Sequence, residues 1–129
     1  MAVSTPKKIL IVDDEAYIRL LIEQTLEDLD ENLVELIQAE NGQDALSLVK
    51  QERPRLVFLD LMMPRMNGFD VCRVIKHEWK MDDVYVVILT AKGQEYDRQV
   101  SAEAGANRYM TKPFDPDELL DLAKEILAA

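Results

Sequence analysis

Ile9-Leu10-Ile11-Val12-Asp13-Asp14-Glu15 is the stretch that decides the fold. Its first four residues are apolar, and a short run of this kind is typical of a β-strand covered on both faces. Three acidic residues follow at once and end the run. From Ile18 onward, apolar residues recur at helical spacing, which predicts an amphipathic helix. The stretch therefore predicts one β–α unit whose strand ends in carboxylates.

Four more strand-like runs follow along the chain, and helix-like segments separate them. The runs are Leu33–Ala39, Leu56–Leu59, Val84–Leu89 and Arg108–Met110. Strands that are joined through helices pair in parallel, by right-handed crossovers. The pattern therefore predicts an α/β fold in which helices cover both faces of a doubly wound five-stranded parallel sheet.

Two local signals add to the strand pattern, one for a turn and one for the start of a helix. Asn41-Gly42 predicts a turn after the second strand. Asp115 is predicted to cap the last helix, with Pro116 at its first position and Glu118 at its third, a combination typical of helix starts.

Composition excludes several classes of protein. The chain has 129 residues, of which 48% are hydrophobic and 31% charged, as expected for one globular domain. A single cysteine excludes a disulfide scaffold and a multi-cysteine metal site. The net charge of −10 disfavours contact with nucleic-acid phosphates, and no apolar run approaches the roughly 20 residues that span a membrane. We expect one cytoplasmic domain over residues 1–129, with residues 1–7 as a flexible tail.

Residues suited to chemistry stand where four of the predicted strands end. Asp13 and Asp14 follow the first strand, Asp60 the third, Thr90 the fourth and Lys112 the fifth. The carboxyl ends of parallel strands meet at one edge of the sheet, where ligands bind. These five side chains are therefore expected to share one pocket.

Three carboxylates in one pocket repel one another unless a cation lies among them. Their hard oxygen atoms favour Mg²⁺, with Mn²⁺ as a substitute. Lys112 and Thr90 are then suited to bind phosphoryl oxygens. A nucleophilic carboxylate, a metal ion and a positive group together predict phosphoryl transfer to an aspartate.

Several motifs, taken in order, resemble those of the receiver domain of two-component response regulators. They are Ile11–Glu15, Asp60–Pro64 with Gly68, Leu89–Ala91, Tyr109 and Lys112–Phe114. The resemblance covers essentially the whole chain. It implies a flavodoxin-like three-layer sandwich with strand order 2-1-3-4-5.

The resemblance also implies a role for each matching acidic residue. Asp60 would be the phosphoacceptor, taking its phosphoryl group from a sensor histidine kinase or a phosphotransfer protein. Asp14 and Asp60 would be direct Mg²⁺ ligands, and Asp13 would act mostly through water. The backbone carbonyl of Met62 would complete the protein ligands.

Further matching residues imply a switch. Lys112 would pair with the phosphoryl group, and its bond to Pro113 is usually cis in relatives. Thr90 would move toward the phosphoryl group, and the Tyr109 ring would turn into the space left behind, although Tyr109 also fits a simply packed aromatic residue. The surface of the fourth helix, fifth strand and fifth helix would change, favouring a downstream effector or a second copy of the chain.

Two positions that flank the site in this family hold Met62 and Lys92 here. In the family these side chains tune the lifetime of the phosphoryl group. Because a methionine cannot orient an attacking water by hydrogen bonding, we expect slow autodephosphorylation.

Other functions fit the sequence less well. A Mg²⁺-dependent phosphohydrolase would need a D-x-D arrangement after the first strand and a cap, whereas this chain has Asp13-Asp14-Glu15. A receiver that works without phosphorylation is disfavoured by the complete acidic set. A flavin or nucleotide site would need a phosphate-binding loop that is absent from the sequence. We therefore expect a signalling module and not a turnover enzyme.

Overall fold

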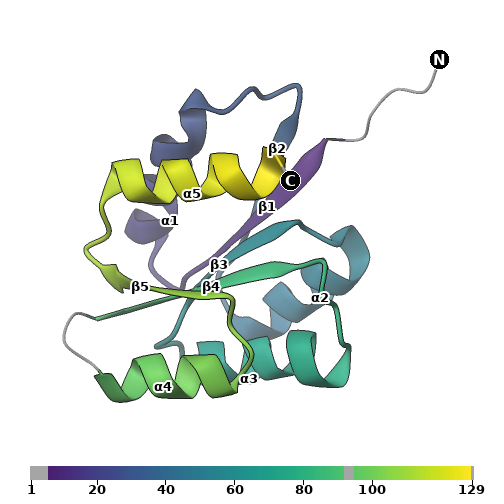
Figure 1. Cartoon of the computed structure of the whole chain (residues 1–129), viewed down its shortest axis with the longest axis vertical. Coiled ribbons are helices and arrows are strands. Elements are labelled where there is room, and N and C mark those ends of the chain that lie inside the picture. The colour runs from purple at the N-terminus through teal and green to yellow at the C-terminus, as the bar shows by residue number, and fades with distance from the viewer. Residues whose placement is uncertain (1–5, 92–94, 129) are drawn as a thin grey trace.

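The five-stranded parallel sheet and its strand order are confirmed. The computed structural model describes residues 6–91 and 95–128, and its strands lie in the order β2-β1-β3-β4-β5 (Figure 1). The strands are β1 (Lys7–Val12), β2 (Val34–Ala39), β3 (Leu56–Asp60), β4 (Tyr85–Ala91) and β5 (Arg108–Lys112). The chain runs outward from β1 to β2 and then returns to place β3 on the other side of β1. This change of direction opens the crevice in which such sheets bind ligands.

Helices cover both faces of the sheet and complete a three-layer sandwich (Figure 1). One face carries α1 (Ala16–Thr25) and α5 (Pro116–Ala128). The other face carries α2 (Gly42–Glu52), α3 (Gly68–Arg73) and α4 (Glu95–Glu103). A 3₁₀ turn, η1 (Leu26–Asp28), follows α1, and a π-helical segment, η2 (Val74–Glu78), continues α3.

Alternate residues of β1, β3 and β4 enter two separate cores. In β1, Ile9 and Ile11 pack with α1 and α5, whereas Leu10 and Val12 pack with α2 and α3. All four are at most 1% exposed. Because both faces of the strand are buried, both sets of alternating positions must be apolar, and this explains the continuous apolar run in the sequence.

The first strand begins earlier than the sequence predicted. Lys7 was expected in a flexible tail, but it is the first residue of β1, and its amide donates to the carbonyl oxygen of Leu33 at 2.9 Å. Pairing with β2 therefore fixes Lys7, which apolar patterning could not reveal because its side chain is charged. Of the rest of the expected tail, Pro6 is described and exposed, and residues 1–5 lie outside the described residues.

Side-chain caps set the starts of α2 and α5. Asp115 caps α5 as predicted, because its Oδ1 accepts from the Asp117 amide at 2.9 Å. Asn41 also caps a helix: its Oδ1 accepts from the Asp44 amide at 2.8 Å, and Gly42 is the first residue of α2. The predicted Asn41-Gly42 turn is therefore the start of the helix itself.

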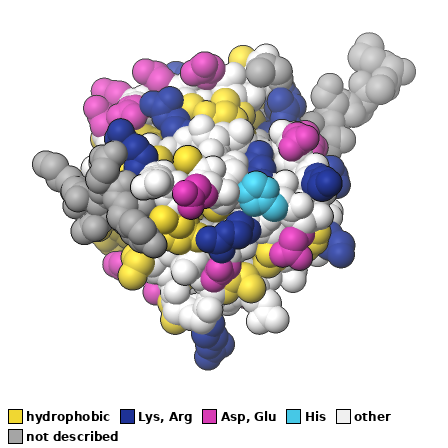
Figure 2. Space-filling model, turned by 60° about the horizontal axis from the view of Figure 1, so that its bottom comes forward, with side chains coloured by type: hydrophobic (Ala, Val, Ile, Leu, Met, Phe, Trp, Pro, Cys, Tyr) yellow, Lys and Arg dark blue, Asp and Glu magenta, His cyan; other side chains and the backbone are white. Residues whose placement is uncertain are grey.

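The surface carries charges of both signs. On the face formed by α3 and α4, acidic and basic side chains are interspersed with apolar ones (Figure 2). Within the part of the chain that the structure describes, no helix combines the length and the apolar character needed to cross a bilayer.

Candidate functional site

Four of the five predicted pocket residues lie buried or half-buried at the carboxyl edge of the sheet. Asp13 directly follows β1, and Asp60 ends β3. Thr90 lies near the end of β4, and Lys112 ends β5. Exposure is 0% for Asp13, 2% for Asp60 and 1% for Thr90. Such burial of polar groups requires partners within the site.

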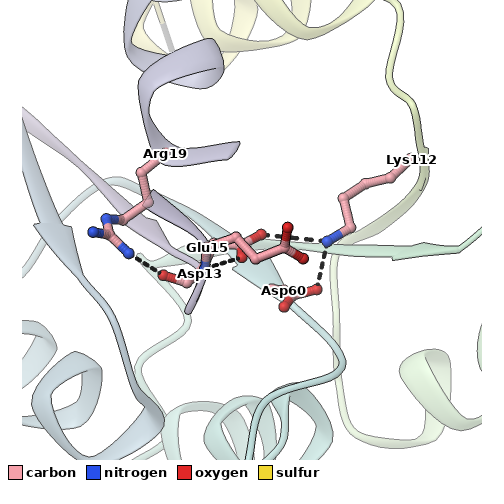
Figure 3. Close-up of polar contacts among 5 residues, drawn as sticks. All are labelled: Asp13, Glu15, Arg19, Asp60 and Lys112. Carbon is pink, nitrogen blue, oxygen red and sulfur yellow. Dashed lines mark hydrogen bonds and ion pairs between the residues drawn. The ribbon is translucent and has the colours of Figure 1, made fainter. Parts of the chain in front are cut away.

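Lys112 supplies the partner that joins the two buried carboxylates (Figure 3). Its Nζ donates to Asp60 Oδ1 at 2.8 Å and to Asp13 Oδ2 at 3.3 Å. The ammonium group of Lys112, at the end of β5, thus joins Asp13, which follows β1, to Asp60, which ends β3. The sequence predicted this meeting from the strand ends alone.

The electrostatics of the site favour an additional cation. Burial raises the pKa of Asp60 from 3.8 to about 6; the Lys112 hydrogen bond opposes this rise, and the charge of Asp13 adds to it. Burial likewise raises the pKa of Asp13. Burial lowers the pKa of Lys112, but its hydrogen bonds to Asp60 and Asp13 and the charges of these two acids together outweigh that effect, and the pKa is raised overall. Lys112 therefore stays charged, yet a single ammonium group does not relieve the crowding of the carboxylates.

Asp13, Asp14 and Glu15 form a second acidic group beside this pair. One carboxylate oxygen from each lies within 4.8 Å of the others. Asp13 Oδ1 also accepts from the Glu15 amide at 2.8 Å, which folds the loop back on itself. Asp14 and Glu15 are exposed, so this group opens to solvent. All these donors are hard oxygen atoms, and they fit Mg²⁺ or Mn²⁺.

The acidic group differs from the predicted ligand set, because it includes Glu15 and does not include Asp60. Glu15 was assigned no ligand role in the sequence interpretation, although its position next to two aspartates was a usable signal. Met62, whose carbonyl was the predicted fourth ligand, donates its amide to the Asp60 carboxylate. Met62 itself is 73% exposed.

The loop after β3 is held in place by a glycine. The Gly68 amide donates to the carbonyl oxygen of Leu61 at 2.9 Å, so the loop returns directly to the strand end. Asn67 then caps α3, because its Oδ1 accepts from the Asp70 amide at 3.0 Å. The hydrogen bond from Gly68 and the cap from Asn67 together hold the loop that follows Asp60.

The residues of the predicted switch lie on neighbouring strands. Thr90 is buried in β4, whereas Tyr109 of β5 is half-buried. The Arg98 guanidinium of α4 lies over the Tyr109 ring, 5.5 Å from its centroid. The Lys112–Pro113 peptide bond is cis, as the resemblance implied. Lys92 lies outside the described residues.

Comparison with known proteins agrees with this geometry. The family model described as the response regulator receiver domain matches residues 9–124. The probable transcriptional regulator ycf27 of Porphyra purpurea is 42% identical over 94% of this chain and 47% of its own length. The alkaline phosphatase synthesis transcriptional regulatory protein PhoP of Bacillus subtilis is 40% identical over 94% of this chain and 48% of its own length. The chain spans about half the length of these curated relatives.

Solved structures extend the comparison to the fold. The receiver domain of NtrX from Brucella abortus superposes with a TM-score of 0.80 at 31% identity, covering 94% of this chain and 98% of that one. At this level of identity, similarity of both sequence and fold extends through the strands that build the acidic site.

Proposed function

Because the chain belongs to the response regulator receiver domain family, we propose that it is a phosphorylation-operated signalling switch with Asp60 as its phosphoacceptor. The observation that carries the proposal is the placement of Asp60, buried at the end of β3 and bonded at 2.8 Å to Lys112 beside a group of acidic residues. A structural ion pair alone would not require the further carboxylates, which destabilise the site unless a cation joins them.

Asp13, Asp14, Asp60 and the Met62 carbonyl would hold Mg²⁺ in this proposal, with Asp13 acting mostly through water. The bound ion would neutralise charge that develops on the phosphoryl oxygens. The chemistry of the donors supports this assignment, because Asp13, Asp14 and Asp60 are all carboxylates. Asp13 and Asp14 already lie together in one acidic group.

The chain's own residues have defined tasks in the proposed transfer. An Asp60 carboxylate oxygen attacks phosphorus, an acyl phosphate bond forms, and the bond from phosphorus to the imidazole nitrogen of the donor breaks. The departing imidazole keeps the electron pair of that bond and takes a proton from solvent. Lys112, already 2.8 Å from Asp60, pairs with one phosphoryl oxygen, and the Thr90 hydroxyl donates to another.

The response to phosphorylation is proposed to pass through Thr90 and Tyr109. Movement of Thr90 toward the phosphoryl group would empty space behind β4, and the Tyr109 ring would turn inward to fill it. The surface of α4, β5 and α5 would then bind a downstream effector or a second copy of the chain. By analogy with the PhoP relative, whose name describes transcriptional regulation, the effector would control gene expression.

The domain's partners follow from the same chemistry. The phosphoryl donor would be a sensor histidine kinase or a phosphotransfer protein in the cytoplasm. The domain promotes its own phosphorylation and is not a turnover enzyme in this proposal. It contacts neither nucleic acid nor membrane directly, consistent with its net charge of −10.

Intact-mass measurement tests the proposal. The protein is incubated with a small acyl phosphate, in Mg²⁺ or in a chelator. We expect the mass to rise by one phosphoryl group in Mg²⁺ and to stay unchanged in the chelator. Reduction with borohydride, which converts an aspartyl phosphate to homoserine, should mark Asp60. A protein that stays unlabelled in Mg²⁺ contradicts the proposal, and steady hydrolysis of small phosphomonoesters would favour the phosphohydrolase instead.

The exposed Met62 predicts a long-lived phosphoryl group. Its side chain offers no hydrogen-bond donor that could orient a water molecule next to Asp60. In the Met62→Asn variant an amide can do so, and one such hydrogen bond accelerates hydrolysis by up to about tenfold. The decay of the labelled mass after removal of the donor measures this. Equal decay rates in the two proteins would contradict the role given to Met62.

A further inference from the structure

Arg19 of α1 has no role in the site described so far, yet its side chain lies at the edge of that site (Figure 3). Its Nη1 donates to the carbonyl oxygen of Asp13 at 2.6 Å. Its Nε donates to Gln38 Oε1 of β2 at 3.2 Å. The side chain is only 15% exposed, so the guanidinium is held in place and is not free in solvent.

Besides the hydrogen bond from the Glu15 amide to Asp13 Oδ1, the loop that Arg19 contacts is held at the backbone of Asp13. Glu15, the N-cap residue of α1, makes no side-chain capping bond. The Asp13 amide donates to the carbonyl oxygen of Ala39 at 3.2 Å, which ties the N-terminal side of the Asp13 backbone to β2. Arg19 binds the opposite side, at the Asp13 carbonyl. The backbone of Asp13 is thus held from both directions.

The bond to the Asp13 carbonyl has a consequence for Asp14. The carbonyl oxygen of Asp13 and the amide of Asp14 belong to the same planar peptide unit. When Arg19 fixes that oxygen, it fixes the plane and therefore the direction in which Asp14 leaves the backbone. Asp14 is exposed, so the backbone is the main support for the direction of its carboxylate.

We propose that Arg19 is a positioning residue for the metal site and that it acts through the Asp13 carbonyl to set the direction of the Asp14 carboxylate. The inference rests on the proposed function, because it takes Asp14 as a Mg²⁺ ligand. Arg19 acts through its charge-assisted hydrogen bond to the Asp13 carbonyl oxygen. A bond of this kind is stronger and more directional than a neutral one.

The test compares two variants of the whole chain by calorimetric titration with Mg²⁺ alone. Arg19→Met keeps much of the apolar stem and removes the donors. Glu40→Gln is the matched control, because it weakens the 4.0 Å ion pair between Glu40 and Arg19 and leaves the bond to Asp13 in place. Residues that orient metal ligands commonly contribute about ten- to a hundredfold in affinity. We expect Arg19→Met to bind Mg²⁺ at least about tenfold more weakly, and Glu40→Gln to bind as wild type does.

A second readout needs no metal. In the metal-free protein, the backbone amide resonances of Asp14 and Glu15 should shift in Arg19→Met and not in Glu40→Gln, because only the first variant frees the peptide plane. If Arg19→Met does not fold, Arg19→Gln replaces it with the same expected loss, since the shorter side chain cannot reach the Asp13 carbonyl.

Each result decides the matter. A loss smaller than about tenfold in the folded Arg19 variant overturns the inference. So does an equal loss in Glu40→Gln, which would assign the effect to the ion pair between Arg19 and Glu40 and not to the carbonyl bond. If the wild-type protein binds Mg²⁺ and takes up label, and the Arg19 variant does the same, this inference alone is contradicted and the proposed function stands. A wild-type protein that binds no Mg²⁺ removes both.

Discussion

The Asp60→Asn variant is expected to take up no phosphoryl group and yet to be more stable than the wild-type protein when divalent ions are removed. An amide is not a nucleophile toward phosphorus at neutral pH, so uptake should be lost completely. The gain in stability has a separate cause, because Asp60 is a buried carboxylate whose charge is costly in the folded state.

The pH dependence of this gain follows from the pKa of Asp60. Burial raises that pKa from 3.8 to about 6, and the Lys112 hydrogen bond only partly opposes the rise. When folding raises the pKa of a carboxyl group, the folded state is favoured most at a pH below the pKa of the unfolded state, where the group is protonated in both states. This contribution to stability is lost as the pH rises through the pKa of the folded state. At about 1.4 kcal/mol per pKa unit, the cost at neutral pH is at most about 3 kcal/mol.

Urea denaturation in a chelator, between pH 4 and pH 7.5, measures the difference between the two proteins. We expect the advantage of Asp60→Asn to grow as the pH rises toward about 6 and then to level off. Asp121→Asn, the same chemical change on the exposed surface of α5, is the control and should alter stability little. An Asp60→Asn variant that accepts label, or that is less stable than wild type at pH 7.5, would contradict the prediction.

The parts of the site that could be predicted from the sequence are those that depend on strand ends. Asp13, Asp60, Thr90 and Lys112 each stand at or near the carboxyl end of a strand, and the topology of a parallel sheet brings such ends together. Apolar runs revealed the strands because both faces of the sheet are covered. One local pattern and one topological rule were therefore sufficient for these four residues.

The parts that could not be predicted depend on contacts between elements. Arg19 resembles any solvent-facing helical arginine in the sequence, and only the packing of α1 beside β1 and β2 brings its guanidinium to Asp13. Lys7 joins β1 through backbone pairing, which leaves no trace in apolar periodicity. The π-helical segment Val74–Glu78 likewise keeps the apolar spacing that predicted an ordinary helix.

The Gly68→Ala variant is expected to lose both stability and phosphoryl uptake. A Cβ at this position would lie 2.7 Å from the carbonyl oxygen of Asp60 and 2.9 Å from the Cα of Leu61. Both neighbours are backbone atoms, so relief requires movement of the strand end that carries the phosphoacceptor. Overpacking of this kind typically costs about 1–3 kcal/mol. The displaced Asp60 would also lose its 2.8 Å bond to Lys112.

The Gly42→Ala variant distinguishes the loss of stability from the loss of phosphoryl uptake. Gly42 stands at the equivalent place in α2, and its added Cβ would lie 2.9 Å from the Met66 carbonyl oxygen, away from Asp60. Both variants should unfold at lower urea concentration than the wild type. Only Gly68→Ala should also take up label more slowly in Mg²⁺ under conditions in which both are fully folded. Equal rates of uptake in the two variants would mean that the backbone under Asp60 tolerates the shift, and that the position of its carboxylate is set mainly by Lys112.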